Sequence, residues 1–528
     1  MAKRKRGRPR PRPAAQDRAP GPRAWWLDRL SGRAQVALSV GALLLVVLIY
    51  RAPLVFEGKS PVGADVIGSK GQNHQIEQYR KRTGKRALWN PYVFSGMPVY
   101  HRYGGLTPSL DTLLSLATNT PGRNGALYLL IGGVGMLLLL RYLGVSRLPA
   151  LIGALCFLLI PHWQGLLQAG HFAKFRPIMM MPWVLMSFLF LLDRRTLLAW
   201  LCFVLAFCLQ LRTQHYQILF YTGLLLFAVG VRYGIGWLRE GAYLRILRTV
   251  ATILAAVGLL LLMVAQPLWV TREYTPYSIR GGTGEAGSTG LDFGYATGWS
   301  FSPKEMLTLV MPRFFGGSSS QQYSGNAFPP EVMARYFRDG RIPGYWGDMP
   351  FSGNTEYLGV VALILAALGL YAHRRNGLLL ALAILAAFSV LLSFGRHFPA
   401  LYGLFFRHVP VFNKFRVPSM ILVLVMFIVS LLAAFGMASV LHTDRSRFAA
   451  LGRAVLWIGG GLVLIGLIPL LFGGAFSFQR PGEAGRYGRL LPYLQAARRD
   501  LMRADALRLI LLAGACCGLI WTYLRGWW

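Results

Sequence analysis

Long apolar runs constrain this chain more than any other feature. It has 528 residues, of which 54% are hydrophobic and 14% are charged, and its mean hydropathy is +0.44. A soluble protein of this length is less apolar, and a helix that crosses a bilayer needs about 20 apolar residues. The sequence therefore predicts an all-α polytopic membrane protein with about twelve transmembrane helices. The predicted spans are 34–50, 125–140, 147–161, 176–192, 197–211, 215–231, 249–269, 356–372, 377–394, 418–440, 454–473 and 506–524. Two of them, 147–161 and 197–211, are short enough to tilt or to be partly buried instead.

Basic residues predict which side each loop occupies. Residues 1–33 are rich in Arg, Lys and Pro, which predicts a disordered cytoplasmic tail and favours membrane orientation over nucleic-acid binding. The short arginine-bearing loops then fall on that same side, and the end of the chain returns to it. The predicted organisation is the tail, a transmembrane core at 34–440 with large exoplasmic loops at 51–124 and 270–355, and C-terminal transmembrane helices at 441–528. A short helix in the membrane interface is expected at 107–118.

The predicted exoplasmic loops carry many cations, although positive charge usually collects on the cytoplasmic side. The net charge is +36, and the basic tail explains only part of it. An anionic ligand on this face, such as a lipid phosphate or pyrophosphate, would account for the excess, because Arg and Lys bind phosphate by charge-assisted hydrogen bonds. Contact with anionic lipid headgroups is the alternative explanation.

Polar clusters interrupt the apolar pattern at this same predicted face. The loop after the first span carries Asp65, and the segments 168–176 and 212–217 join later spans. Polar groups that enter a bilayer are costly and usually functional. Each cluster alone is also typical of a helix cap or an interfacial anchor. Several on one face indicate that they converge on one cavity.

These clusters carry a family resemblance. The chain resembles the bacterial YfhO-like membrane proteins, within the polyprenyl-phosphate-dependent glycosyltransferases of the GT-C fold, over about residues 36 to 440. The matching pieces are Asp65, Trp89-Asn90-Pro91, Phe94-Ser95-Gly96-Met97-Pro98, Gly170-His171 with Lys174, Gln214-His215 and Asn413-Lys414-Phe415-Arg416-Val417-Pro418. The resemblance implies a multi-pass protein of the bacterial inner membrane, with both termini cytoplasmic and its site on the exoplasmic side.

The resemblance also implies chemistry and roles. A sugar would pass from a polyprenyl-phosphate donor to a hydroxyl of an envelope glycan, lipid or polymer, with membrane lipids around the protein. Asp65 would be the catalytic base. Its alternative role is a structural ion pair with a nearby Lys or Arg. Lys174, Arg416 and Arg313 would bind the donor phosphate. The expected substrate contacts are Asn73, His74, Trp89, Asn90, His171, Gln214 and His215.

The same residues are compatible with other functions, and they also bear on whether a metal site is expected. A transporter or a flippase for a lipid-linked substrate also suits about twelve spans, but such proteins often show two similar halves and a site at mid-membrane. A non-catalytic assembly protein for envelope polymers is a third reading. The histidines match no strong metal-ligand spacing, so no metal site is predicted.

Overall fold

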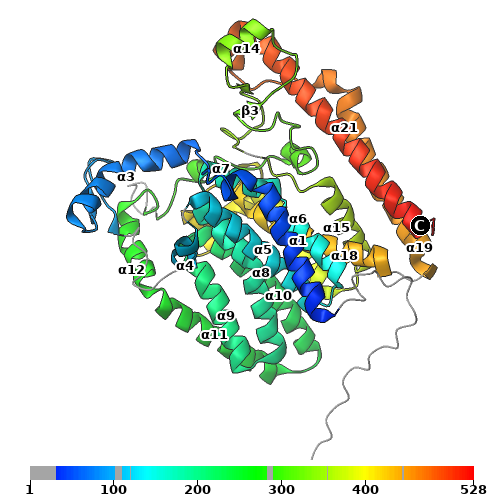
Figure 1. Ribbon diagram of the computed structural model, residues 1–528. Helices are drawn as coiled ribbons and strands as arrows, with labels where there is room; N and C mark the ends of the chain where they lie inside the picture. Colours follow the sequence, from blue (N-terminus) through cyan, green and yellow to red (C-terminus); the bar gives the residue numbers. More distant parts are fainter. Residues whose placement is uncertain are drawn as a thin grey trace, which may run out of the picture.

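The computed structural model describes residues 31–100, 110–118, 120–281, 289–353, 355–442 and 445–527 (Figure 1). Most of the predicted basic tail, residues 1–30, and the beginning of the expected interfacial helix at 107–118 lie outside these ranges. Regular structure in the described ranges is almost entirely helical. The prediction of an all-α protein is therefore confirmed.

Nine helical segments of the described chain are long and apolar enough to cross a membrane. They are α1 (Gly32–Tyr50), α5 (Pro121–Tyr142), the segment Arg147–Ala169 with α6 (Arg147–Leu158) and α7 (Pro161–Ala169), α8 (Phe172–Arg194), α10 (Tyr216–Arg239), α11 (Tyr243–Met263), the segment Pro418–His442 with α18 (Leu422–His442), α19 (Arg445–Leu471), and the segment Glu483–Leu524 with α21 (Leu491–Leu524). These helices support a polytopic membrane protein.

Three shorter apolar helices occupy the remaining predicted spans: α9 (Leu197–Leu211), α15 (Val360–Ala372) and α16 (Gly377–Ser393). A count of twelve requires that all three also cross. The predicted span 147–161 is not among these short helices, because α7 extends this run to Ala169.

The other elements, apart from the 20-residue α3, have ten residues or fewer. They are α2 (Ala52–Val55), α3 (Ala64–Thr83), α4 (Leu110–Ala117), α12 (Ala265–Tyr274), α13 (Phe293–Ala296), α14 (Pro330–Tyr336), α17 (Pro399–His408), α20 (Glu483–Tyr487) and several 3₁₀ turns. Strands β1 (Trp89–Asn90) and β2 (Met97–Pro98) pair antiparallel, with Trp89 opposite Pro98. Strands β3 (Gln321–Gln322) and β4 (Arg341–Ile342) form a second antiparallel pair, with Gln321 opposite Ile342.

Helix α18 is the centre of the apolar core. It is apolar on all sides, which is typical of a buried helix, and it packs against α15, α6 and α16. Its contact with α15 depends on glycine, because a Cβ on Gly436 would collide with the backbone oxygen of Leu365. A Cβ on Gly369 would likewise meet the oxygen of Leu432. Small residues let two helix backbones approach this closely in a membrane.

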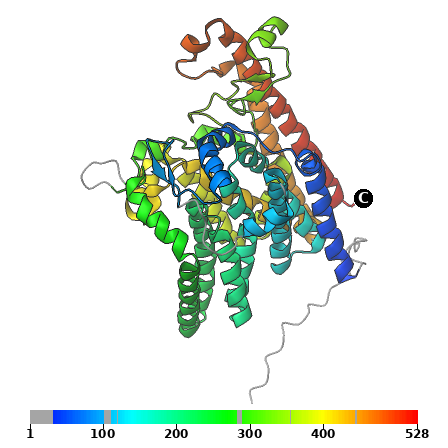
Figure 2. The same ribbon diagram turned by 60° about the vertical axis from the view of Figure 1, so that its left-hand side comes forward.

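The C-terminal helices form a long hairpin that extends beyond the body of the molecule. Helices α19 and α21 pack side by side, and Figures 1 and 2 both show the far end of α21 standing clear of the other helices. The N-terminal end of α21 packs against the segment that contains α14, β3 and β4, and together they form a protruding lobe. Its small core is Tyr323, Phe328, Ile342, Leu494, Ala497 and Leu501. The last predicted span begins at 506, whereas helix α21 already begins at Leu491, so the chain before 506 is in part helical.

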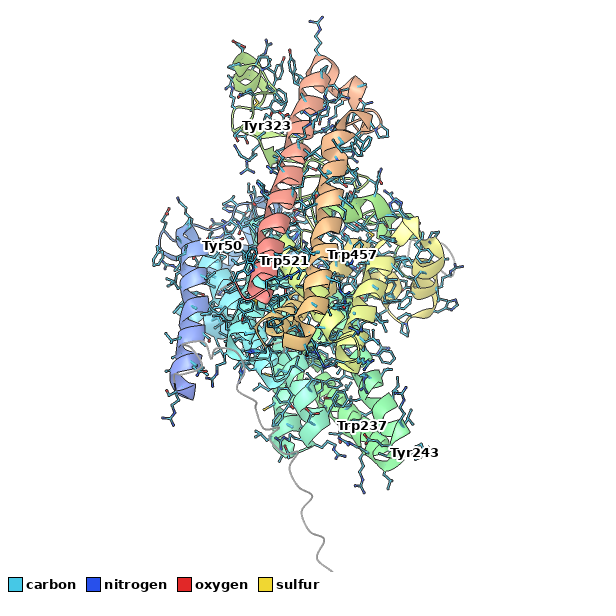
Figure 3. All side chains as sticks on the ribbon, turned by 90° about the vertical axis from the view of Figure 1, so that its right-hand side faces the viewer. Tyr50, Trp237, Tyr243, Tyr323, Trp457 and Trp521 are labelled. Atoms are coloured by element: carbon cyan, nitrogen blue, oxygen red, sulfur yellow. The ribbon has the colours of Figure 1, made fainter. Side chains whose placement is uncertain are left out.

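Contacts between the ends of helices mark one end of the helical body. There, the Tyr142 hydroxyl donates to Asp193 over 2.6 Å, the Tyr233 hydroxyl donates to Asp193 over 3.0 Å, and Ser146 lies 2.6 Å from His442. Figure 3 shows Trp237 and Tyr243 at this end and Tyr323 of the lobe at the other. The loops predicted to be cytoplasmic thus lie together, at the end away from the lobe.

Candidate functional site

Asp65 and His171 meet at the end of the body nearer the lobe. Asp65 lies in the first turn of α3, and His171 immediately precedes α8. Asp65 Oδ2 lies 2.8 Å from His171 Nε2, and the side chains are 69% and 34% exposed. The carboxylate is therefore held in place by the imidazole and still open to a substrate.

Two glycines bring these side chains together. Gly170 ends α7 with φ of 83°, a left-handed conformation that favours glycine, and a Cβ there would collide with Val66 of α3. Gly63 precedes α3, and a Cβ there would meet the backbone of Gln168 and Ala169. The two segments approach this closely only because both positions lack a side chain.

Lys174 and Arg416 adjoin the Asp65–His171 pair. Lys174, in the first turn of α8, is half-buried and lies within the electrostatic reach of Asp65, Arg416 and Glu356. Arg416 Nη1 donates to the Tyr295 hydroxyl over 2.6 Å. The two cations thus lie close enough to repel each other.

Arg280 and Lys414 add two more cations. The Lys414 ammonium donates to the backbone oxygen of Arg280 over 3.0 Å, and the Arg280 guanidinium donates in return to the backbone oxygen of Lys414. Burial and the neighbouring charge of Arg416 lower the pKa of Arg280. We define the cation cluster as Lys174, Arg280, Lys414 and Arg416. Of these four, Lys174 lies within electrostatic reach of Asp65 and of Glu356, which is also paired with His162 at 3.1 Å, so positive charge is in excess here.

The two histidines of the site are neutral near pH 7. Burial and the charge of Lys174 lower the pKa of His171, although Asp65 acts in the opposite direction. Burial, together with the charges of Lys174 and Arg280, lowers the pKa of His215 to about 3. His215 also accepts a hydrogen bond from the backbone N–H of Ile218 through Nδ1, at 3.4 Å, as the N-cap of α10. A neutral His171 can donate its Nε2 proton to the Asp65 carboxylate.

Strained backbone surrounds the cation cluster. Gln214, Val411 and Val417 have φ values of 59°, 61° and 62°. A β-branched residue such as valine rarely adopts this conformation, and such strain is often found at functional sites. The backbone oxygen of Arg416, next to Val417, accepts a hydrogen bond from Gln217 Nε2 over 2.8 Å. This contact fixes the turn that presents Arg416.

Several residues expected in the site lie elsewhere or have another contact. Arg313 is bound by the buried carboxylate of Asp505 on α21, with 3.0 Å between Arg313 Nε and Asp505 Oδ1. Asn90 is buried and donates to the backbone oxygen of Gln72 over 3.1 Å, which fastens the β1–β2 hairpin to α3. These two contacts are structural.

The remaining expected residues lie on α3, on the hairpin and beside α10. Asn73 donates to the backbone oxygen of Ser69 on its own helix, and His74 is exposed. Trp89 is 54% exposed and packs beneath Gly96. Gln214 precedes His215 in the strained turn. The structure thus brings together Asp65, Lys174, Arg416, His171 and His215.

Sequence reasoning did not select Arg280, Lys414, Tyr295 or Glu356 as site residues. Lys414 lies within the matching piece Asn413-Lys414-Phe415-Arg416, which was a usable signal. The other three depend on contacts between distant segments. Within the described residues, no three His, Cys, Asp or Glu side chains are grouped as metal ligands.

Comparison of the chain with protein-family models, with curated proteins and with solved structures found no match.

Proposed function

We propose that this protein is a membrane glycosyltransferase that transfers a sugar from a polyprenyl-phosphate donor to a hydroxyl of an envelope glycan, lipid or polymer. The observation that carries the proposal is that the open Asp65–His171 pair lies within electrostatic reach of Lys174, a member of the half-buried cation cluster, at one end of a helical membrane body. A base beside a set of cations is what such a transfer requires.

The proposed reaction assigns each group a task. The acceptor hydroxyl gives its proton to the Asp65 carboxylate, and its oxygen forms a bond to the anomeric carbon of the sugar. The bond between that carbon and the phosphate oxygen breaks, and its electron pair leaves with the polyprenyl phosphate. Lys174 and Arg416 stabilise the negative charge that grows on the phosphate. His171 orients the carboxylate by donating to it.

The proposal includes the GT-C fold, membership of the YfhO-like family, and a place in the bacterial inner membrane with the site on the exoplasmic side. The apolar walls between helices would hold the prenyl chain of the donor. The position of the charged groups at one end of the body supports an interfacial reaction over passage through the membrane, because a transport path places polar groups deep within the spans.

A transfer assay tests the proposal. Protein in liposomes receives a panel of radiolabelled polyprenyl-phosphate sugars with an envelope fraction as acceptor. The Asp65→Asn variant keeps the side-chain size and removes the base, so we expect a rate lower by about 10²- to 10⁴-fold. Glu57→Gln is the matched control, because Glu57 lies in the same loop and is paired with Lys59 at 2.5 Å.

Equal rates for Asp65→Asn and the parent would refute the assignment. Movement of the labelled lipid between leaflets without any transfer product would favour the flippase instead.

A further inference from the structure

A second, separate cleft lies where the protruding lobe joins the body. Its volume is about 720 Å³, within the range of small-molecule binding sites. Three stretches of chain line it: the loop 347–350, the turn 396–397 and the segment 480–486 that precedes α21. None of these belongs to the Asp65 site.

The two carboxylates of this cleft are already neutralised. Asp348 lies 2.8 Å from the Lys304 ammonium, and Glu483 receives two hydrogen bonds, of 2.6 and 2.8 Å, from the buried guanidinium of Arg498. Burial would raise the pKa of Asp348, but Lys304, Ser302 and His397 outweigh it and lower this pKa. Both carboxylates therefore stay ionised and paired.

Three arginines of the cleft add positive charge. Arg480 lies beside Glu483, but that carboxylate is already bound by Arg498. Arg480 donates to the backbone oxygens of Pro350 and Met349, at 3.0 and 2.9 Å, and Arg396 donates to the backbone oxygen of Asp348 at 3.0 Å. Arg486 lies over the ring of Tyr487. Carbonyls and rings hold a guanidinium in place without cancelling its charge. The cleft thus presents three positive charges from two segments of the chain, and backbone oxygens fix those of Arg396 and Arg480.

The lining favours a soluble ligand over a lipid. Besides its arginines, its two carboxylates and His397, the lining consists of Gly347, Pro350, Pro481 and Gly482, and no Leu, Ile, Val or Phe of the described residues lines it. An acyl chain would therefore find no apolar track here. Guanidinium groups bind carboxylate and phosphate in two-point contacts, which suits an anionic saccharide.

The cleft is also close to the Asp65 site. Ser300 Oγ accepts a hydrogen bond from the backbone N–H of Arg396 at 2.9 Å, and Tyr295, five residues earlier, binds Arg416. Even a fully extended chain spans only about 18 Å over five residues. A saccharide bound by the cleft could therefore reach the cation cluster with another part of its length.

We propose that the arginines Arg396, Arg480 and Arg486 form a binding site for an anionic saccharide that carries carboxylate or phosphate groups. The binding itself does not depend on the proposed transfer. Its use as the acceptor subsite rests on the proposed function.

Binding measurements test the site with defined probes. Protein in phosphatidylcholine nanodiscs is titrated calorimetrically with an oligogalacturonate, which is anionic, and with a neutral maltooligosaccharide of equal length. We expect only the oligogalacturonate to bind. Arg396→Gln and Arg486→Gln should each weaken it about tenfold or more, because each removes a charge-assisted contact. Arg489→Gln, an exposed arginine of the same lobe outside the cleft, should leave the affinity within about twofold.

Four results would overturn the proposal. The first three are equal binding of the neutral oligosaccharide, an equal loss with Arg489→Gln, and displacement of the probe when phosphatidylglycerol is added to the nanodiscs, which would indicate a lipid site. The fourth is absence of oligogalacturonate binding. The Asp65→Asn variant should bind the probe normally. A protein that binds the probe but transfers no sugar would refute the proposed function and leave this site intact.

Discussion

Asp65 Oδ2 lies 2.8 Å from His171 Nε2 and so joins the first turn of α3 to the start of α8. The two residues are 106 positions apart in the chain. The alternative role weighed for Asp65 was an ion pair with Lys or Arg, whereas its partner here is a histidine with a lowered pKa. A neutral imidazole leaves the carboxylate its negative charge, which a base requires.

The first prediction concerns this pair. His171→Ala removes the donor that orients Asp65, so we expect kcat to fall about tenfold, less than for Asp65→Asn, with little change in KM for the donor. Because the pKa of His171 is lowered, the imidazole stays neutral as the pH falls through about 6.5, the ordinary histidine value. The parent rate should therefore be flat through that pH. A kcat–pH profile with a fall centred at 6.5 would contradict the proposed state of His171.

The second prediction separates the cation cluster from Arg313. Lys174→Met and Arg416→Gln should each weaken donor binding by about 1.5–3 kcal/mol, the usual worth of a hydrogen bond to a charged group. Arg313→Gln should leave donor affinity unchanged, because this guanidinium is bound by Asp505. It should instead lower thermal stability, since the buried carboxylate loses a partner.

Binding of a fluorescent polyprenyl phosphate to the three purified variants checks both statements. A loss of affinity with Arg313→Gln as large as that with Arg416→Gln would restore Arg313 to the donor site.

The sequence predicted the helical membrane class and the gathering of four loops at one end, because hydropathy and arginine position depend on local composition. It could not predict the partner of Arg313, which is supplied by Asp505 nearly two hundred residues later. Nor could it predict that Asn90 is a structural contact. The residue type alone does not show whether an asparagine side chain binds a substrate or a backbone oxygen.

The lobe shows a second limit of sequence reasoning. Residues 491–505 are too charged to resemble a membrane span, so the hydropathy pattern predicts that the last helix begins only at 506. The structure continues it back to Leu491, because Leu494, Ala497 and Leu501 pack against Tyr323 and Phe328 of a distant loop. Long-range packing stabilises these turns, and a local window does not detect it.

The third prediction tests the contact between α15 and α18. Gly436→Ala places a methyl group against the backbone of Leu365, which cannot give way as a side chain would. We expect a destabilisation of about 1–3 kcal/mol, seen as a lower melting temperature in detergent. Gly460→Ala on α19 is the control, because nothing lies near its added methyl group. A melting temperature equal to that of the control would mean that the two helices are not in close contact.

The fourth prediction concerns acid stability. The pKa of His215 is about 3 in the folded protein and about 6.5 in an unfolded chain. Between these values the unfolded state binds a proton that the folded state does not, so stability falls as the pH decreases below about 6.5, by up to about 1.4 kcal/mol per pH unit. His215→Gln should therefore reduce the loss of melting temperature between pH 7 and pH 5. An unchanged loss would show that His215 is not held neutral.

The last prediction is the sidedness on which the shared site depends. Asp65, Lys174, His215 and Arg416 lie together at one end, whereas Ser439 and His373 meet at the other, 3.1 Å apart. In a variant without Cys156, Cys202, Cys208, Cys516 and Cys517, single cysteines replace Lys70, Ala400 or Arg375, which are all exposed. The cells are treated so that the reagent reaches the outer face of the inner membrane while that membrane stays intact. In these cells, an impermeant thiol reagent should label Lys70→Cys and Ala400→Cys. Arg375→Cys should react only after the membrane is opened, because it lies at the end predicted to be cytoplasmic.

Labelling of Arg375→Cys in intact cells, together with no labelling of Lys70→Cys, would reverse the orientation. Labelling at Lys70→Cys but not at Ala400→Cys would place the two loops on opposite sides of the membrane, which a single site shared by Asp65 and Arg416 cannot accommodate.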